Sequence, residues 1–532
     1  MLKSVRWVGI VAGLVPSALI GQTQRPTLVV AVTIDQMRPD YVSGWATQLT
    51  GGLARFWRDG AFFVSGFQDH ANTETAPGHA SILSGRFPYS TGIIANSLGV
   101  NTPDAPLIES ADAGASPFRF RGTTLADWLH AKDSSARVLS VSRKDRSAIL
   151  PVAPAHSHTV IWYSPRTTRF TTSSWYGTTI PSWVREFNAE RGVLALAGRT
   201  WDLLLAPSEY PEPDSVAAET RTPVFPHAIP TDSARVGTAV VNSPWMDSLT
   251  LALALRGVGA MSLGAASNRT DLLAVSLSST DAVGHRWGPD SRELHDQVLR
   301  VDRYLGVFMD SLIALRGRDR VVFVLTADHG VAPSPELRSR FGDNAGATRV
   351  QTALFRPLVS AARARLRAAG LDTTALRWED LVLWIDRNAL KGAPFDADAL
   401  SRWFADSVRT IPGVLRADVI DHMTRVDTTT DAIARRWLRM FPVGVESYPG
   451  VKALVAVTLK PYLYLGAGDV ASHGTPHDYD ARVPIAFLGA PFARSRPTTK
   501  ANVVDIAPTL AAVLGVTPLE RLDGRVLREI LR

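Results

Sequence analysis

Five segments of the chain are dense in β-branched and apolar residues, and a charged residue follows each of the first four within four positions. The segments are residues 27–34, 138–142, 272–277, 321–325 and 483–488. Because apolar side chains occupy both faces of each segment, the pattern predicts strands that are buried on both sides, as in a parallel sheet.

Segments with helical character lie between these strands. Residues 293–315 place apolar side chains close to a 3.6-residue period, and residues 357–369 and 505–514 also suit helices. Strands that alternate with helices predict an α/β fold with a mostly parallel central sheet flanked by helices. In such sheets, ligands bind at the carboxyl ends of the strands.

Two stretches lack this alternation. Residues 155–260 are rich in Thr, Ser, Pro and aromatic residues, and residues 335–460 mix an Arg/Ala-rich helix with short strands. We expect both to be insertions that cap the sheet. The expected organisation is therefore one catalytic domain over residues 22–532 with two cap insertions.

The N-terminus has the pattern of a secretory signal peptide. Lys3 and Arg6 precede an apolar stretch, residues 7–20, which ends in small and polar residues near Gly21. That stretch is too short, and too interrupted by glycine and proline, for a membrane span. We expect residues 1–21 to be a signal peptide and the mature chain to be exported, periplasmic or extracellular, with no membrane span.

Composition limits the kinds of metal site, nucleophile and partner that the chain can have. The 532 residues include 57 Lys and Arg against 50 Asp and Glu, a formal net charge of +7, and no cysteine. Without cysteine the chain cannot form disulfides, thiolate metal sites or a cysteine nucleophile, so any metal must be held by His and carboxylates. No Lys/Arg cluster is long enough to follow a nucleic-acid backbone, and we expect no nucleic-acid partner. Composition leaves the oligomeric state open.

Acidic and imidazole side chains gather where the predicted strands end. The candidates are Asp35, Asp281, His285, Asp328, His329 and His473. Three carboxylates and three imidazoles offer ligands for two divalent ions, and the imidazole content favours zinc. Taken singly, each pair is more typical of a surface or capping interaction. If the six converge, two metals could clamp the attacking and leaving oxygens of a displacement at phosphorus.

Thr75 is the candidate nucleophile. Pro77 and the residues after it predict a helix start, which puts the Thr75 hydroxyl at the positive end of a helix dipole. Metal coordination would lower the pKa of that hydroxyl. The alternative is that Thr75 is only a capping residue.

Several motifs together indicate a family. They are residues 33–41, 73–79, 92–96, 142–150, 279–289, 326–330, 472–480, 504–509 and 523–525. With these motifs the chain resembles the alkaline phosphatase superfamily, in its branch of phosphodiesterase/nucleotide pyrophosphatase-like enzymes. Within that branch it is most similar to the secreted, zinc-dependent monoesterases of the bacterial phosphate-irrepressible alkaline phosphatase type.

The resemblance implies two Zn²⁺ ions and a covalent phospho-threonine intermediate. One zinc would be held by Asp281, His285 and His473. The second would be held by Asp35, Thr75, Asp328 and His329. Small-molecule phosphate esters would be the substrates.

The expected preference between monoester and diester substrates depends on three residues, Lys144, Arg146 and Asn96. A monoester is a dianion, so extra donors aimed at its terminal oxygens favour it selectively. Lys144 and Arg146 would point the same way from an extended segment. In the family resembled, such a Lys-x-Arg pair with an Asn marks monoesterases. We therefore expect a monoesterase with weaker diesterase activity; the alternatives are a nucleotide pyrophosphatase/phosphodiesterase and a non-catalytic zinc- or phosphate-binding protein.

Other histidines receive plainer interpretations. His156 and His158 have zinc-like spacing but no carboxylate nearby in the sequence. His79 is expected to pack beside Thr75 or support a ligand. His477 is expected to be a neighbour of His473 in the pocket.

Overall fold

The computed structural model describes residues 25–190, 192–215, 219, 224–338, 348–390, 392–446, 450–466 and 468–532. The signal peptide expected at residues 1–21 lies outside the described residues. Within the described part of the chain, no helix combines the length and apolar character that a bilayer crossing requires.

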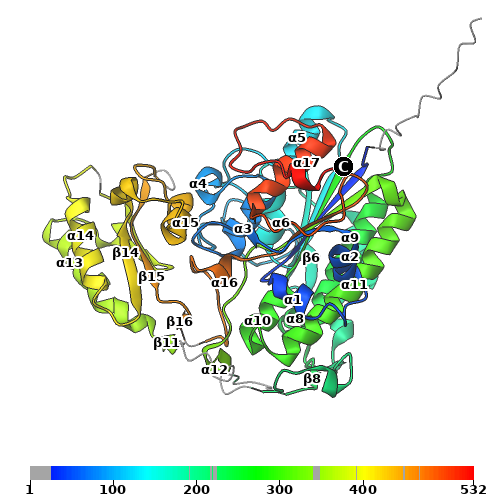
Figure 1. Cartoon of the computed structure of the whole chain (residues 1–532), viewed down its shortest axis with the longest axis horizontal. Coiled ribbons are helices and arrows are strands. Elements are labelled where there is room, and N and C mark those ends of the chain that lie inside the picture. The colour runs from blue at the N-terminus through cyan, green and yellow to red at the C-terminus, as the bar shows by residue number, and fades with distance from the viewer. Residues whose placement is uncertain are drawn as a thin grey trace, which may run out of the picture.

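An eight-stranded sheet forms the centre of the molecule (Figure 1). In spatial order it contains β2 (Ala61–Phe63), β17 (Ile485–Leu488), β10 (Val321–Thr326), β1 (Leu28–Ile34), β9 (Asp271–Leu277), β4 (Val138–Ser142), β5 (Thr159–Ser164) and β6 (Arg169–Thr171). The five strands from β10 to β5 are parallel, whereas β17 and β6 run antiparallel to their neighbours. The predicted α/β fold with a mostly parallel sheet is confirmed.

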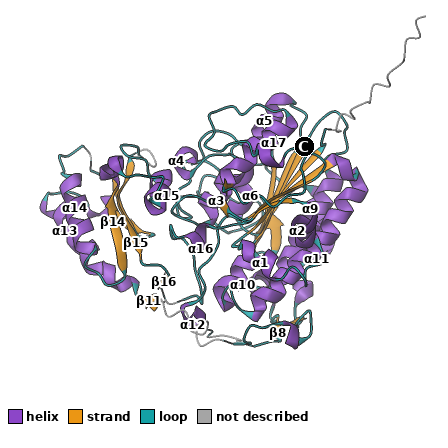
Figure 2. Ribbon diagram, viewed as in Figure 1, coloured by secondary structure: helices purple, strands orange, loops and turns teal. Residues whose placement is uncertain are grey.

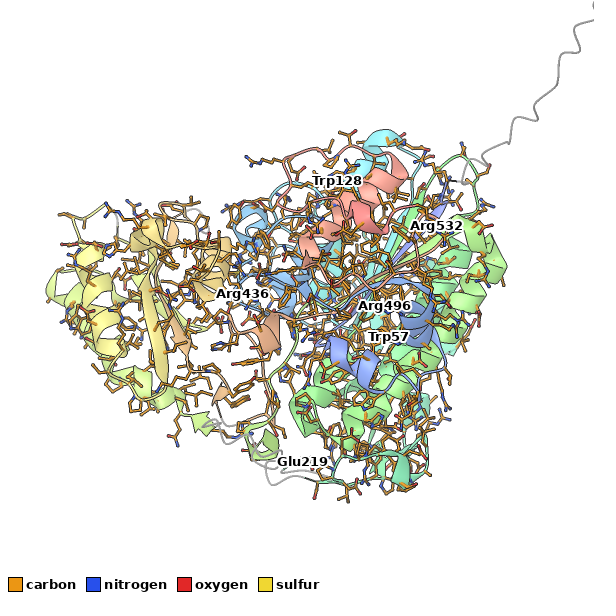
Figure 3. All side chains as sticks on the ribbon, viewed as in Figure 1. Trp57, Trp128, Glu219, Arg436, Arg496 and Arg532 are labelled. Atoms are coloured by element: carbon orange, nitrogen blue, oxygen red, sulfur yellow. The ribbon has the colours of Figure 1, made fainter. Side chains whose placement is uncertain are left out.

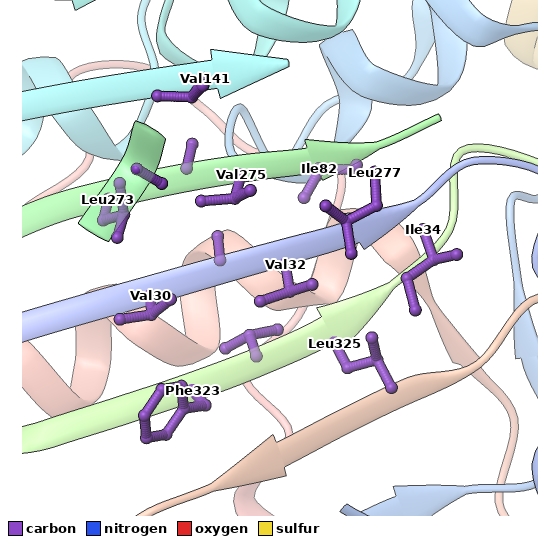
Figure 4. Close-up of a cluster of buried hydrophobic side chains, with 14 of the residues drawn as sticks. Val30, Val32, Ile34, Ile82, Val141, Leu273, Val275, Leu277, Phe323 and Leu325 are labelled. Atoms are coloured by element: carbon purple, nitrogen blue, oxygen red, sulfur yellow. The ribbon is translucent and has the colours of Figure 1, made fainter. Parts of the chain in front are cut away.

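β1 lies between β10 and β9 in the parallel set, and all seven of its residues are buried. Its last residue, Ile34, is in register with Leu277 of β9, and Thr33 is in register with Thr326 of β10. Figure 4 shows Val32 and Ile34 packed among apolar side chains of the neighbouring strands. Because the three strands end in register, the residues that follow them meet at one edge of the sheet.

Helices cover both faces of the sheet (Figure 2). One layer contains α2 (Gly52–Asp59), α9 (Pro244–Ala260) and α11 (Arg292–Arg316). The other contains α3 (Thr75–Ile82), α5 (Leu125–Lys132), α6 (Asp145–Ile149) and α17 (Ile506–Leu514). The helices predicted at residues 293–315 and 505–514 are thus confirmed as α11 and α17.

Residues 348–465, which we call the inserted lobe, carry a second sheet. Its antiparallel strands are β12 (Leu376–Glu379), β13 (Val382–Asp386), β15 (Val451–Leu459) and β14 (Val414–Val419), in that order. The helices α13 (Arg356–Ala368) and α14 (Ala397–Val408) share a hydrophobic core with this sheet. The lobe lies to the side of the main sheet in Figure 1.

Charged residues join the inserted lobe to the rest of the molecule. Asp69 is almost fully buried and is surrounded by Arg435, Arg436 and Arg439 of α15 (Ala432–Met440), together with Lys500. Arg436 is also buried, and it lies at this junction in Figure 3. Buried charges persist in proteins when they are paired, so this cluster fixes α15 against the main domain.

The segment 155–260, expected to cap the sheet, contributes to the main domain instead at both of its ends. β5 and β6 extend the central sheet, with β5 parallel to β4. α9 packs against β4 and β9. The aromatic and β-branched residues Val160–Tyr163 are buried, because they sit between β4 and β6 within the sheet.

Candidate functional site

The residues expected to hold metals follow three neighbouring strands. Asp35 follows β1, Asp328 and His329 follow β10, and α10 (Ser279–Trp287), which begins after β9, carries Asp281. All four side chains are buried. The in-register ends of the parallel strands thus bring together residues that lie far apart in the sequence.

Two groups of these side chains have ligand atoms close enough to share an ion. One consists of Asp281, His329 and His473, and the other of Asp35, Asp328 and His329; within each group the ligand atoms lie within 4.8 Å of one another. His329 therefore stands between the two groups, with its ring stacked on that of His473 at 3.5 Å between centroids.

His285 joins the cluster from the next turn of α10. Its Nε2 lies 3.1 Å from Oδ1 of Asp281, and Nε2 of His473 lies 3.7 Å from the same oxygen. The six side chains singled out in the sequence are therefore all brought to one place.

Backbone carbonyls orient all three imidazole rings. Nδ1 of His285 donates to the carbonyl of Ala471 at 2.9 Å. Nδ1 of His473 donates to the carbonyl of Thr73 at 2.7 Å. Nδ1 of His329 donates to the carbonyl of Gly330 at 3.0 Å. Since each Nδ1 donates to a carbonyl, each Nε2 faces the cluster and offers a lone pair there when the ring is neutral. This is the arrangement of metal-binding histidines.

Several buried atoms of the cluster lack a hydrogen-bond partner. They include Oδ1 of Asp35, Oδ2 of Asp328 and Nε2 of His329. A buried polar atom without a partner is costly, and coordination to a cation is a common remedy. The donor set and these unpartnered atoms fit a divalent metal.

The pKa shifts within the cluster also fit a bound cation. Burial, with repulsion from Asp281 and Asp328, raises the pKa of Asp35 to about 6. Burial acts to lower the pKa of His285, but Asp281 and Asp469 outweigh it and raise that pKa to about 9. Carboxylates this close together repel one another, which a bound cation would relieve.

Thr75 is the first residue of α3, and its side chain is buried. Nζ of Lys144 donates a 3.3 Å hydrogen bond to its Oγ1. The same ammonium group lies 2.6 Å from Asp35 and 2.7 Å from Asp281. Lys144 therefore links the hydroxyl to carboxylates of both groups.

Arg146 does not lie on the expected extended segment. β4 ends at Ser142, and α6 begins at Asp145, so Arg146 sits in the first turn of a helix. The alternation expected of Lys144 and Arg146 was wrong because the chain turns into a helix between them. The positive charge of Arg146 acts to lower the pKa of Glu74, the residue before Thr75.

Asn96 contacts the start of the Thr75 helix. Oδ1 of Asn96 accepts a hydrogen bond from the backbone N–H of Ala76, and the backbone N–H of Asn96 donates to Oε2 of Glu74. Because Oδ1 accepts this bond, the Nδ2 group of the same amide can serve as a donor. Burial, reinforced by Asp380, raises the pKa of Glu74 to about 8.

Two supporting residues have clear roles only in the structure. Gln36 donates from its backbone to Asp328 at 3.1 Å and from its side chain to Asp281 at 3.0 Å, bridging the two groups. His79 lies with Nδ1 2.8 Å from the carbonyl of Thr75 and 3.2 Å from Asp328. The sequence suggested a supporting role for His79 but gave no signal for Gln36.

The other histidines engage local partners. His156 stacks on Trp175, and Nδ1 of His158 donates to the carbonyl of Val152. Nε2 of His477 donates to the carbonyl of Leu459. Among the described residues, none of these three belongs to a metal-competent group.

Comparison with known proteins identifies the family. The model of the type I phosphodiesterase / nucleotide pyrophosphatase family matches residues 29–385, which include all the site residues above except His473. The chain belongs to this family.

The relatives of this phosphodiesterase family member match nearly its whole length. It is 30% identical to alkaline phosphatase PhoV of Synechococcus elongatus, over 97% of this chain and 95% of PhoV. It is 32% identical to alkaline phosphatase PhoK of a Sphingomonas species, over 94% of this chain and 91% of PhoK. The crystal structure of alkaline phosphatase PafA superposes with a TM-score of 0.84 at 26% identity, covering 96% of this chain and 99% of PafA. These similarities support a phosphatase of this family.

Proposed function

We propose that this protein is a metal-dependent alkaline phosphatase that hydrolyses phosphate monoesters through a phospho-threonine. The observation that carries the proposal is the position of Thr75. Its hydroxyl lies at the start of a helix, within hydrogen-bond distance of Lys144, whose ammonium group contacts carboxylates of both metal-competent groups.

The proposed cofactor is a pair of zinc ions. Asp281, His285 and His473 would hold one. Asp35, Thr75, Asp328 and His329 would hold the other. Zinc bound at these residues supplies positive charge that lowers the pKa of the threonine hydroxyl and stabilises charge on the reacting oxygens.

The reaction takes place in two displacements at phosphorus. In the first, Oγ1 of Thr75 gives up its proton and bonds to phosphorus while the bond from phosphorus to the alcohol oxygen breaks, and that oxygen takes up a proton as the alcohol leaves. In the second, water gives up a proton as it attacks phosphorus, the bond from phosphorus to Oγ1 breaks, Oγ1 regains a proton, and inorganic phosphate is released. The helix N-terminus at Thr75 favours the negative charge of the phosphoryl group in both steps.

Lys144, Arg146 and the amide of Asn96 are assigned to the terminal oxygens of the phosphoryl group. A monoester presents more negative charge there than a diester, so charged donors benefit it more. This assignment favours monoester substrates. The family model, which is named for phosphodiesterases, keeps diester hydrolysis as the second candidate.

The test is a paired assay of p-nitrophenyl phosphate and bis-p-nitrophenyl phosphate, combined with metal analysis. We expect about two equivalents of zinc, loss of activity on chelation, and recovery on adding zinc. Thr75→Ala should reduce monoester turnover by roughly 10³-fold or more while retaining zinc. A preference for the diester would replace the monoesterase assignment, and metal binding without turnover would favour the non-catalytic alternative.

We further propose that the protein is exported, with residues 1–21 as its signal peptide and residues 22–532 as its catalytic part. N-terminal sequencing of the protein recovered outside the cytoplasm tests this. A start at or near Gln22 supports the proposal, and a retained N-terminus contradicts it.

A further inference from the structure

A cavity of about 340 Å³ opens beside the metal cluster, between the main domain and the inserted lobe. His285, His473 and Asn96 line it, and residues of the lobe form much of the remaining wall. The volume lies in the range of roughly 300–1,000 Å³ that small-molecule sites occupy. The part of a substrate attached to phosphorus would extend into this cavity.

The charged residues of the cavity wall are acidic. Glu74, Asp380 and Asp480 line it, and the described lining residues include no lysine or arginine. Glu74 and Asp380 lie close enough for their charges to act on each other. Asp480 accepts hydrogen bonds from the backbone and hydroxyl of Thr475, whereas Asp380 is exposed at the cavity wall.

Asp380 reaches the cavity through an unusual turn. Asp380 and Leu381, which connect β12 to β13, both have positive φ angles, 50° and 60°. Such angles are uncommon for residues other than glycine and carry a conformational cost. The turn places a carboxylate and an apolar side chain of the lobe in the wall of the cavity.

Tyrosine rings form another part of the wall. Tyr462, Tyr464 and Tyr479 all line the cavity, and the rings of Tyr462 and Tyr479 lie 4.8 Å apart at an angle of 33°. The guanidinium of Arg349 already lies 4.6 Å from the centre of the Tyr464 ring, and the candidate rings for a cationic ligand are therefore those of Tyr462 and Tyr479. Tyr462 also has a positive φ, of 64°. Aromatic faces attract organic cations, especially where carboxylates are near.

We infer that this cavity selects phosphate esters whose leaving alcohol carries an ammonium group. The inference rests on the proposed phosphatase function, and it adds that the lobe determines leaving-group charge. Carboxylates and tyrosine rings attract such a group, and the same carboxylates repel an alcohol that carries a second negative charge.

Three phosphate esters of similar size distinguish an effect of leaving-group charge from an effect of leaving-group shape. Phosphocholine carries a quaternary ammonium group, 3,3-dimethylbutyl phosphate is its uncharged carbon isostere, and 3-phosphoglycerate adds a carboxylate. At about pH 9, where ordinary carboxyl groups are ionised, we expect kcat/KM to fall in that order. The cationic ester should exceed its isostere by about tenfold. Equal values for the first two, or a preference for the isostere, would overturn the inference.

Asp380→Asn tests the contribution of the lobe. It should reduce the ratio of kcat/KM between phosphocholine and its isostere, and an unchanged ratio in folded protein would contradict the role of Asp380. Asp406→Asn is the matched control, since Asp406 is an exposed carboxylate of α14 in the same lobe and does not line the cavity. This control should keep the wild-type ratio.

The wild-type comparison separates the two proposals and does not depend on any variant folding. Turnover of p-nitrophenyl phosphate together with equal kcat/KM for the cationic ester and its isostere refutes the charge selectivity alone. Absence of turnover on every monoester refutes the proposed function itself.

Discussion

Gly78 of α3 lies directly against the backbone of Asp328. A Cβ atom at position 78 would overlap the carbonyl group of Asp328, so only glycine allows this approach. The contact fixes the distance between the helix that begins at Thr75 and the residues that follow β10.

Gly78→Ala should therefore displace the Thr75 helix from the cluster of carboxylates and imidazoles. We expect kcat/KM for p-nitrophenyl phosphate to fall by roughly 100-fold, because small misplacements of a reacting group are costly. Gly259→Ala is the control: Gly259 lies in α9 with open space around the added methyl group. It should keep full activity and gain up to about 1 kcal/mol of stability. Equal activity of the two variants would contradict the proposed role of this contact.

Gln36 should control metal affinity without touching substrate. Gln36→Asn retains a side chain that tolerates the positive φ of 66° at this position, but the shorter amide cannot keep the hydrogen bond to Asp281. We expect zinc affinity to weaken by roughly 10- to 100-fold. Competition with a chelator measures this, and activity should recover at saturating zinc. Unchanged affinity would mean that the bond to Asp281 has no part in metal binding. Gln351→Asn, at an exposed position of the inserted lobe, is the control.

The double substitution Lys144→Ala with Arg146→Ala should change the ratio of two activities. Turnover of p-nitrophenyl phosphate should fall by roughly 10²- to 10³-fold, and turnover of bis-p-nitrophenyl phosphate should fall much less. The reason is that the monoester presents the greater charge to these donors. Equal losses on both substrates would show that the pair does not discriminate between them.

Asp69→Asn should destabilise the protein in a pH-dependent manner. Burial acts to raise the pKa of Asp69, but Arg436, Arg439 and Lys500 outweigh it and hold that pKa well below its ordinary value. The carboxylate therefore stabilises the fold at pH values above its unfolded pKa of about 4, and this contribution is lost as pH falls further.

At neutral pH we expect Asp69→Asn to lower the free energy of unfolding by about 3 kcal/mol. Denaturant unfolding of wild type and variant between neutral and acidic pH measures the difference, which should shrink below about pH 4. A constant difference across that range would contradict the ion-pair explanation.

Local sequence pattern was sufficient for much of the sheet and for the gathering of the six acidic and imidazole residues. β1, β4, β9 and β10 are short runs of apolar residues, and parallel strands in register bring the residues that follow them together. The position of Thr75 at a helix start could also be predicted from the sequence, because Pro77 marks the first turn.

The remaining features depend on contacts between distant segments. The bond from Gln36 to Asp281 spans 245 positions, and neither residue's neighbours in sequence indicate it. β5 was read as part of a cap because its aromatic residues resemble a surface insertion until β4 and β6 enclose them. Asp380 reaches the cavity only through a turn with two positive φ angles at residues other than glycine, which local propensity disfavours.

The buried carboxylate at position 69 has a consequence for engineering. It stands six residues before Thr75 on the same continuous segment, and three of its four charged partners come from α15, the fourth being Lys500. Grafting a foreign lobe onto this scaffold to change substrate preference would remove the three arginines and leave the buried carboxylate with Lys500 alone, on the segment that leads to Thr75. A transplant must therefore bring its own arginines to that junction, or it will damage catalysis before it alters selectivity.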